Sequence, residues 1–286
     1  MFRKLFKKSI SLTEKEVEFH VSFPCRVTKV FSNEGHYVNK EQPVFEFIFD
    51  DFNSGTYYNL AAEENCKIKN INVKENKIIN LGDIIYSYEP LEKNEEFEQK
   101  ALEFRKPILE DTSFAMTTDD FTDDVYIKPY KIAGKQEEYI RTFIFENNSS
   151  LGLGFSLETF NNLPFINVRS LYDEIRLAKG DEMILLFEDQ VKINLLFSRN
   201  PSGGNGIKIN LAAITFEMLQ ILLTKNFLKW KYIDNKTNEY LLGTFSCEEK
   251  KTQGQYSSII EAQYLLRFYT AKFIEANKTF NNKDHQ

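Results

Sequence analysis

The sequence predicts an α+β protein, in which an all-β module over residues 15–90 is followed by a mixed α+β domain over residues 125–286. Three observations support this class. One strand-like pattern occurs twice near the N-terminus, later stretches alternate apolar and polar residues around short turns, and helical stretches occur without regular alternation of strand and helix. The second domain is therefore expected to contain antiparallel hairpins and a long C-terminal helix. Residues 91–124 are expected to form a helical and acidic linker.

The repeat in the first module relates two stretches that are 41 residues apart. "NEGHYVNKEQPVFEF" returns as "KENKIINLGDIIYSY", and apolar residues match apolar residues without a gap. The matched pairs include Cys25 with Cys66, Val27 with Ile68, Val38 with Ile79, Val44 with Ile85 and Phe47 with Tyr88. Each copy reads as strand, turn and strand, with Gly35 or Gly82 free to take positive φ in a turn. Because neither copy could bury its apolar face alone, we expect two interlocked copies in a small flattened barrel.

The two stretches "FPCRVTKVFSNEGHYVNKEQPVFEF" and "LAAEENCKIKNINVKENKIINLGDIIYSYEP" resemble the two passes of the biotinyl/lipoyl-attachment domain family. The family's turn pattern falls on Gly35, Val38, Gln42 and Val44 in the first copy and on Ile79, Gly82, Asp83 and Ile84 in the second. The resemblance covers roughly residues 17–90, which is under a third of the chain. It implies a barrel-sandwich hybrid built from two quasi-symmetric halves.

The resemblance also implies a lysine at the tip of the hairpin that joins the halves, because the family attaches lipoate or biotin to it. Here the corresponding stretch is "FEFIFDDFNSGTYYNLAA", in which Asp51 or Ser54 takes the lysine position, depending on the direction of reading. No lysine occurs between Glu41 and Cys66. We therefore expect an unmodified module without cofactor. Modification at an atypical lysine such as Lys40 or Lys77, which flank turns, stays an alternative.

The linker and the mixed domain carry clear local signals. Residues 91–124 hold eleven acidic and four basic residues. Within them, the stretch from Glu95 to Arg105 favours a helix, which Pro107 is expected to end. A mobile acidic segment is expected to follow the helix. Strands are predicted in "VYIKPYKIA", "YIRTFIFEN", "FINVRSLY" and "IKINLAA". Hairpins are predicted in "DEMILLFEDQVKINLLFSRN", with the turn "EDQ", and in "FLKWKYIDNKTNEYLLGTF", with the turn "DNKTN".

Two helices are predicted in the mixed domain. "TFEMLQILLTKN" begins at the N-cap Thr215, and its core side is expected to hold Phe216, Leu219, Leu222 and Leu223. The chain closes with a helix from about Ser257 to Lys278, whose core side is expected to hold Ile260, Tyr264, Phe268 and Phe273.

No residue pattern points to catalysis or to a metal. Cys25, Cys66 and Cys247 lack metal-ligand spacing, and a redox pair of the first two is less favoured than two equivalent core positions. Of the histidines, His20 and His36 lie in the first module and His285 lies in the polar tail, none with a partner at ligand spacing. The acidic cluster at residues 119–124 lacks the spacing of a calcium loop, and the glycines of "PSGGNG" and "LGLGF" lack a phosphate-binding context.

Charge and hydropathy constrain the partners and the location. The net charge of -6 and the pI near 5.4 argue against a nucleic-acid partner that is bound through a basic face. There is no apolar run of membrane-spanning length and no secretory signal pattern, so we expect a cytoplasmic protein. Residues 2–10, with Phe2, Leu5 and Phe6 on one helical side and lysines on the other, could contact a membrane surface.

These observations leave three hypotheses for function. The first is a non-catalytic scaffold or recognition protein, which uses the unmodified lipoyl-like module and an α+β domain that binds a partner. The second is an enzyme with its active site in the α+β domain, and the third is a biotin or lipoyl carrier modified at an atypical lysine. The 26 phenylalanines and 14 tyrosines favour a protein partner or self-association.

Overall fold

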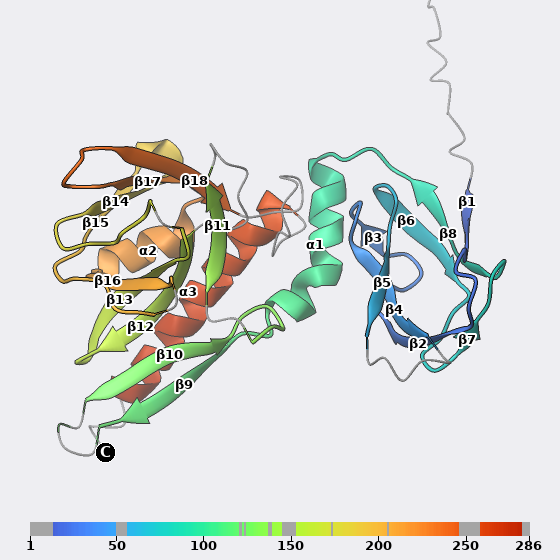
Figure 1. Cartoon of the computed structure of the whole chain (residues 1–286), viewed down its shortest axis with the longest axis horizontal. Coiled ribbons are helices and arrows are strands. Elements are labelled where there is room, and N and C mark those ends of the chain that lie inside the picture. Colours follow the sequence, from blue (N-terminus) through green and yellow to red (C-terminus); the bar gives the residue numbers. More distant parts are fainter. Residues whose placement is uncertain are drawn as a thin grey trace, which may run out of the picture. The chain divides into compact units, whose positions relative to one another are not determined.

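The structure, a computed structural model, describes residues 14–49, 56–119, 122, 124–136, 139–144, 153–172, 174–204, 206–245 and 258–281. It divides into two compact units, Met1–Phe104 and Arg105–Gln286 (Figure 1). Each unit has its own core, and each is described by itself below. The class is α+β, as the sequence predicts.

Unit 1 contains two four-stranded antiparallel sheets, ordered β1-β8-β6-β3 and β5-β4-β2-β7 (Figure 1). Its strands are β1 (Lys15–Glu18), β2 (Cys25–Val30), β3 (Tyr37–Val38), β4 (Pro43–Phe49), β5 (Tyr58–Ala61), β6 (Cys66–Ile71), β7 (Ile78–Ile79) and β8 (Ile84–Pro90). Each sheet combines strands of both repeats, because β2 pairs with β7 and β6 pairs with β3. The two copies are therefore interlocked.

The backbone hydrogen bonds of unit 1 repeat with the sequence. The Val27 N–H donates to the Lys77 carbonyl, and the equivalent Ile68 N–H donates to the His36 carbonyl, both at 2.9 Å. The pairings of β2 with β4 and of β6 with β8 shift register at equivalent positions, between Val27 and Lys29 and between Ile68 and Asn70. This confirms the internal repeat as a two-fold relation between strands.

One core lies between the two sheets and takes equivalent residues from both copies. Its buried members include Phe19, Cys25, Val27, Val44, Phe45, Ala62, Cys66, Ile68, Ile85 and Tyr86. β2 and β6 have the same alternation of buried and partly exposed side chains. Burial on alternate positions is what an amphipathic strand with one face on the core requires.

Helix α1 (Glu95–Leu109) begins after Asn94, whose Oδ1 accepts the Phe97 N–H at 2.8 Å. Its first part belongs to unit 1, where Phe97 and Phe104 pack on Tyr37 and His36 of the β3 segment. The prediction that Pro107 ends the helix is wrong. Proline removes one hydrogen bond, and in the last turn that loss does not stop the helix from reaching Leu109.

Unit 2 contains an eight-stranded antiparallel sheet and a two-stranded ribbon. The sheet has the order β15-β14-β17-β18-β11-β12-β13-β16, and the ribbon pairs β9 with β10. The strands are β9 (Ser113–Thr118), β10 (Val125–Lys131), β11 (Ile140–Ile144), β12 (Leu153–Phe160), β13 (Leu163–Ser170), β14 (Glu182–Phe187), β15 (Lys192–Leu196), β16 (Lys208–Ala213), β17 (Phe227–Ile233) and β18 (Tyr240–Phe245). The predicted turn "EDQ" is a short 3-10 helix, Glu188–Gln190.

Two segments of unit 2 differ from the sequence prediction. Residues 113–118, expected to belong to a mobile acidic segment, form β9, because its Phe114 ring packs 5.1 Å from the Tyr269 ring and its backbone pairs with β10. β12 was not predicted, since its glycine masks the strand pattern. A Cβ at Gly154 would lie 2.9 Å from the Cβ of Tyr139, so the glycine admits a close neighbour.

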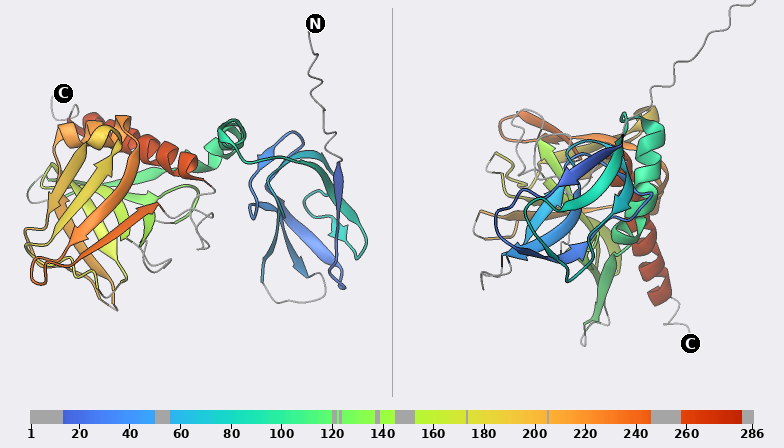
Figure 2. Two further views of the ribbon diagram at one scale, coloured as in Figure 1. Left: turned by 90° about the horizontal axis from the view of Figure 1, so that it is seen from above. Right: turned by 90° about the vertical axis from the view of Figure 1, so that its right-hand side faces the viewer.

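Helices α2 (Phe216–Thr224) and α3 (Ile259–Asn281) complete unit 2, and α3 extends along one side of its sheet (Figure 2). Thr215 caps α2 as predicted, since its Oγ1 accepts the Met218 N–H at 3.3 Å. The expectation that Phe216 faces the core is wrong, because this first-turn side chain is 56% exposed.

The buried side of α3 is rotated from the predicted one. It consists of Glu261, Ala262, Leu265, Leu266, Tyr269, Thr270 and Phe273, whereas the expected Ile260, Tyr264 and Phe268 are not among its fully buried residues. Aromatic residues on both sides of the helix made the apolar periodicity ambiguous, and only Phe273 was assigned correctly.

Candidate functional site

The strongest candidate site is the outer face of four neighbouring strands in unit 2, β15, β14, β17 and β18. Alternate residues of these strands, such as Leu185 on β14 and Trp230 on β17, are buried against the interior. Their neighbours point the other way, because successive strand residues face opposite sides of a sheet. The outward positions carry Ile184, Leu186, Lys192, Lys229, Lys231, Tyr240 and Leu242.

Strand register places lysines on both sides of an apolar strip, which consists of Ile184 and Leu186 of β14. Leu186 lies opposite Lys192 on β15 and opposite Lys229 on β17. In the next outward row, Lys231 lies between Ile184 and Leu242. Since neighbouring strands are about 4.8 Å apart, Lys192 and Lys229 are separated by about 10 Å across Leu186.

These residues line a shallow groove of about 380 Å³. The Lys231 ammonium lies 4.3 Å from the centre of the Tyr240 ring, a cation–π contact that orients this side chain. Among the described residues, Lys192, Lys229 and Lys231 form no ion pair with a carboxylate. Within the described part of the chain, the groove therefore joins three lysines that have no carboxylate partner to an apolar strip.

The carboxylates near this face are mostly engaged elsewhere. Asp189 pairs with Lys225 at 2.6 Å, and Glu188 accepts a hydrogen bond from Asn226 at 2.9 Å. Glu182 lies one outward row farther, opposite Ile233. In a chain of net charge -6, this face is a local concentration of positive charge.

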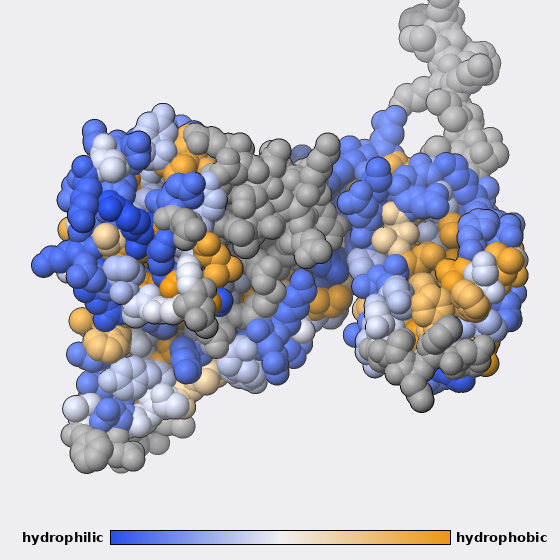
Figure 3. Space-filling model, in the orientation of Figure 1, coloured by the Kyte–Doolittle hydropathy of each residue, from blue (hydrophilic) through white to orange (hydrophobic). Residues whose placement is uncertain are grey.

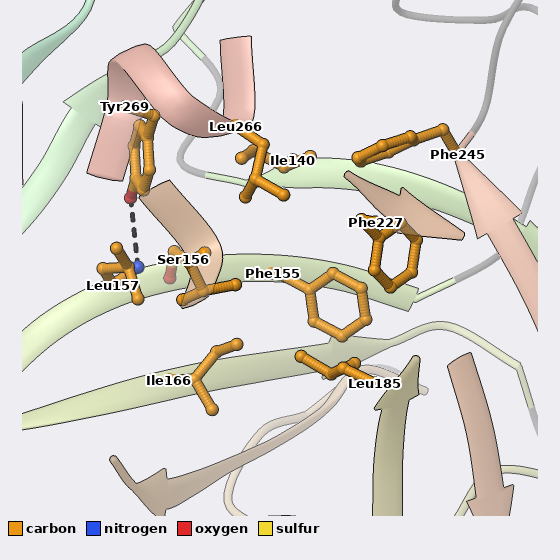
Figure 4. A pocket seen from close by; sticks show the side chains of 11 residues that line it. Ile140, Phe155, Ser156, Leu157, Ile166, Leu185, Phe227, Phe245, Leu266 and Tyr269 are labelled. Atoms are coloured by element: carbon orange, nitrogen blue, oxygen red, sulfur yellow. Dashed lines mark hydrogen bonds between the residues drawn. The ribbon is translucent and has the colours of Figure 1, made fainter. Parts of the chain in front are cut away.

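Unit 2 holds a second space, which is too small for a ligand. About 20 Å³ is free within a lining of apolar side chains that includes Phe155, Ile166 and Leu185 (Figure 4). The Tyr269 hydroxyl at its edge accepts the Leu157 N–H at 3.1 Å (Figure 4). A volume of this size is comparable to a single water, so this space is a packing feature.

Unit 2 also contains a buried polar cluster around Asp181. The Asp181 carboxylate accepts hydrogen bonds from the Tyr232 hydroxyl and from the backbone of Ala178 and Asn235. Burial, followed by the bond to Asp181, raises the pKa of Tyr232 well above its usual value. The bond from Tyr232 ties the Asp181 loop to β17, and the bond from Asn235 joins it to the loop that follows β17.

The residues that the resemblance to the biotinyl/lipoyl-attachment family sets at the acceptor position, Asp51 to Ser54, lie outside the described residues. Of the alternative lysines, Lys77 donates from Nζ to the Asn72 carbonyl at 3.0 Å, and the Lys40 side chain is exposed. The predicted membrane-contact segment, residues 2–10, also lies outside the described residues, as do Cys247 and His285.

The two described cysteines are equivalent core residues, each fully buried and not bonded to the other. Cys25 lies on β2 and Cys66 on β6, at the same position of the repeat. Burial raises the pKa of the Cys66 thiol to about 12, with a smaller contribution from the Glu64 charge. A thiol with this pKa is a poor nucleophile at neutral pH.

The described histidines and the acidic cluster at residues 119–124 have other contacts. His36 stacks on Phe104 with ring centres 4.1 Å apart, its Nδ1 accepts the Asn33 N–H, and burial lowers its pKa. Around the acidic cluster, Thr122 bridges Asp119 and Asp124 by hydrogen bonds. No group of metal-binding side chains occurs in the part of the chain that the structure describes.

Unit 1 exposes several large apolar side chains. Figure 3 shows hydrophobic residues gathered on one of its faces. Over all of unit 1, the large apolar and aromatic side chains that are exposed include Phe23, Tyr57, Tyr58, Ile78, Leu81 and Ile84. Contiguous exposed apolar surface is typical of interaction sites.

Sequence reasoning missed the lysine groove. The signal was present in "FLKWKY", where the alternation of Lys229, Trp230 and Lys231 places both lysines on the polar face of a strand. What the sequence could not supply was the strand order, which brings Lys192 to the other side of Leu186.

Comparison with known proteins gives little guidance. No family model and no curated protein matches the chain. One similar solved structure is described as "a single-chain, multi-domain long-chain acyl-CoA carboxylase"; it is 13% identical, with a TM-score of 0.23, over 50% of this chain and 15% of that chain. The chain thus spans a small part of that enzyme. No described helix is long and apolar enough to cross a membrane.

Proposed function

We propose that this protein is a non-catalytic recognition protein whose second unit binds an acidic peptide segment of a partner protein in the groove of β14, β15, β17 and β18. The observation that carries this proposal is the set of three lysines without carboxylate partners among the described residues, around an apolar strip. Unit 1 serves as an unmodified biotinyl/lipoyl-like module. The interlocked two-fold repeat and the absence of lysine between Glu41 and Cys66 support that assignment.

Charge and shape together favour a peptide as the occupant. Carboxylates of an acidic segment would pair with Lys192, Lys229 and Lys231, and an apolar side chain between them would cover Leu186 and Ile184. A nucleic-acid backbone would use the lysines but would leave the apolar floor exposed. Exposed ion pairs stabilise by about 0.2–1 kcal/mol each, so three pairs provide specificity and a modest affinity.

The test is binding of a fluorescent synthetic peptide in which aspartates flank a central leucine and phenylalanine, measured by anisotropy with the full chain. The variant Lys192→Glu/Lys229→Glu/Lys231→Glu should weaken binding at least tenfold, since about 1.5 kcal/mol of pairing is lost and repulsion is added. Binding to the parent protein should weaken as salt rises.

A control variant changes the net charge of the protein by the same amount at sites outside the groove. Lys128, Lys135 and Lys236 are exposed lysines of unit 2 outside the groove, and their triple replacement by Glu should leave binding within about twofold. Equal loss in both variants would mean that only net charge matters and would contradict the proposal. Equal binding of a peptide with lysines in place of aspartates would contradict it as well.

The carrier hypothesis is tested separately by the intact mass of the protein from its native cell. An unmodified mass is expected. Added mass of a biotinyl or lipoyl group on a lysine would overturn the assignment of unit 1 as an unmodified module.

A further inference from the structure

The lysine groove of unit 2 has a charge arrangement that favours one kind of acidic ligand. Its strands β15, β14, β17 and β18 are neighbours in the sheet (Figure 1). Outward side chains form rows across these strands, a first row of Lys192, Leu186 and Lys229 and a second row that includes Ile184, Lys231 and Leu242. Both rows line the same groove, so a ligand can contact the two rows together.

The first row holds two lysines that face each other across Leu186. Because neighbouring strands are about 4.8 Å apart, the backbones at Lys192 and Lys229 are about 10 Å apart. The flexible four-carbon stem of each lysine lets both ammonium groups reach one anion above the leucine. Both side chains are exposed, and neither has a carboxylate partner in the described part of the chain. The first row is therefore suited to a single anion held by two cations.

The third lysine of the groove is held apart from this pair. The Lys231 ammonium lies 4.3 Å from the centre of the Tyr240 ring. Tyr240 belongs to β18, on the side of β17 that is away from β15, and it lies opposite Ile233, one row beyond Lys231. The contact therefore draws this ammonium away from Lys192, and the anion site consists of two lysines.

An anion with two negative charges matches two facing ammonium groups. A carboxylate has one charge and two oxygens, whereas a phosphorylated side chain has about 1.5 to 2 charges at neutral pH and three strong acceptor oxygens. Each lysine can then donate to its own phosphate oxygen. Lysine binds phosphate as a point charge, so the site does not require the planar fork of arginine.

The second row provides an apolar surface beside the anion site. Ile184 lies on the same face of β14 as Leu186, about 7 Å farther along the strand, and both side chains are only partly buried. An aromatic ring that lies on Ile184 can carry a phosphate to the position above Leu186. Phosphoserine has no ring and would leave Ile184 uncovered. The pair of rows therefore fits phosphotyrosine, whose body is apolar and whose tip is a dianion.

The carboxylates around the groove determine which way the ligand lies. Glu182 of β14 is one row beyond Ile184, on the side away from Leu186. A phosphate at that end would be repelled, whereas a phosphate at Leu186 lies between the two lysines. Past the other end of β14, Glu188 accepts a hydrogen bond from Asn226. The charges thus favour the phosphate in the first row and the ring in the second.

We propose that the groove recognises a phosphotyrosine within the acidic peptide, with the phosphate between Lys192 and Lys229 and the ring on Ile184. This inference rests on the proposed function and names the side chain that the groove selects. Binding of the partner by unit 2 then depends on a tyrosine kinase that adds the phosphate and a phosphatase that removes it.

The test compares synthetic peptides in which aspartates flank a central leucine and one variable residue, with anisotropy measured on the full chain. The phosphotyrosine peptide should bind at least fivefold more tightly than the tyrosine peptide, because two charge-assisted contacts are added. A sulfotyrosine peptide has the same ring but a single negative charge. It should bind at least twofold more weakly than the phosphotyrosine peptide, and equal binding would contradict the requirement for a dianion.

Variants of the protein locate the phosphate. In Lys192→Gln/Lys229→Gln, the preference for phosphotyrosine over tyrosine should fall below twofold. The control Lys128→Gln/Lys135→Gln removes the same charge at exposed sites outside the groove and should keep the preference. A preference that persists in the groove variant would place the phosphate elsewhere and overturn the proposal.

The peptides also separate this inference from the proposed function. If the tyrosine peptide binds and phosphorylation adds less than twofold, the inference is wrong and the proposed function stands. If neither peptide binds, both are wrong. A phosphoserine peptide that binds as tightly as the phosphotyrosine peptide would also overturn the inference, because the ring would then contribute nothing.

Discussion

The Cys66 thiol shows how position in the core sets the chemistry of one residue. It lies between the two sheets, bonded to no other described cysteine, and burial raises its pKa to about 12. The neutral thiol is stabilised by the fold, whereas the thiolate would lose its solvation. At neutral pH the side chain therefore acts as a small apolar group.

A pH dependence follows from this shift. Because the pKa in the folded state is raised above the unfolded value of about 9, the stabilisation is complete below pH 9 and is lost as pH rises toward 12. Between about pH 9 and pH 10.5, the free energy of unfolding of the parent should fall by about 1.5 kcal/mol more than that of Cys66→Ala. Urea unfolding at the two pH values measures this difference. Equal losses in both proteins would contradict the buried-thiol explanation.

Two turn positions in each copy of the repeat have left-handed backbone. Glu41 has a φ of 66°, and its equivalent in the second copy is Gly82, with a φ of 88°. Gly35, with a φ of 86°, is likewise equivalent to Asn76, with a φ of 66°. Each copy thus needs two left-handed residues, and each supplies glycine at only one of the two positions.

The replacement Glu41→Gly should stabilise unit 1 by ~1 kcal/mol, because glycine removes the left-handed strain of a residue with a Cβ. Its backbone bond to the Ala62 carbonyl is kept. The matched change Asn76→Gly should have a smaller effect, since asparagine tolerates this conformation. Chemical unfolding measures both changes. A destabilised Glu41→Gly would show that the side chain, and not the backbone, determines this turn.

Among the elements, those with strong local signals were predictable. The repeat predicted every paired strand of β2, β4, β6 and β8, and the cap at Thr215 predicted the start of α2. β9 and β12 were missed because their strand character depends on neighbours distant in sequence, namely α3 for Phe114 and Tyr139 for Gly154. Tertiary contacts decide such segments, and no local pattern contains them.

Helix α3 does more than cover the sheet, because it supplies a hydrogen-bond acceptor to a strand edge. β11 pairs with β12 only at Phe155 and Gly154 among the described residues, and beyond this point the Leu157 N–H donates to the Tyr269 hydroxyl. Tyr269 is fully buried. The helix therefore satisfies a backbone group that no neighbouring described strand reaches.

The variant Tyr269→Phe should lower the free energy of unfolding by about 1–3 kcal/mol, because it leaves a buried N–H without its acceptor. Tyr264→Phe is the control: its hydroxyl bonds to Glu110 in an exposed pair, and its loss should cost less than about 0.5 kcal/mol. Thermal unfolding followed by circular dichroism compares the two. Small and equal losses of stability in the two variants would mean that another group accepts the hydrogen bond of the Leu157 N–H.

At the scale of the whole molecule, the lysine groove depends on contacts that no local sequence pattern contains. The groove depends on the strand order of unit 2, which joins β15, β14, β17 and β18 although β16 and α2 intervene in the sequence. The repeat in unit 1 could be predicted, whereas the packing of Phe104 of α1 on His36 of the first copy could not. Sequence alone thus identified the repeat and missed the lysine groove.

The division into two units predicts separate unfolding transitions. Trp230 is the only tryptophan, it is fully buried in unit 2, and its fluorescence reports that unit alone. Cys66 is buried in unit 1, so the alkylation of its thiol reports the unfolding of unit 1. Each unit has a core of its own, which is the requirement for independent cooperative folding.

The variant Ile68→Ala removes a fully buried side chain of unit 1 and should cost about 2–5 kcal/mol there. It should shift the urea midpoint of Cys66 alkylation to lower urea and leave the midpoint of Trp230 fluorescence unchanged. Leu185→Ala, in the core of unit 2, should have the reverse pattern. If either variant moved both midpoints equally, the two units would unfold as one cooperative structure, because a loss of stability in one core would then be shared by the other.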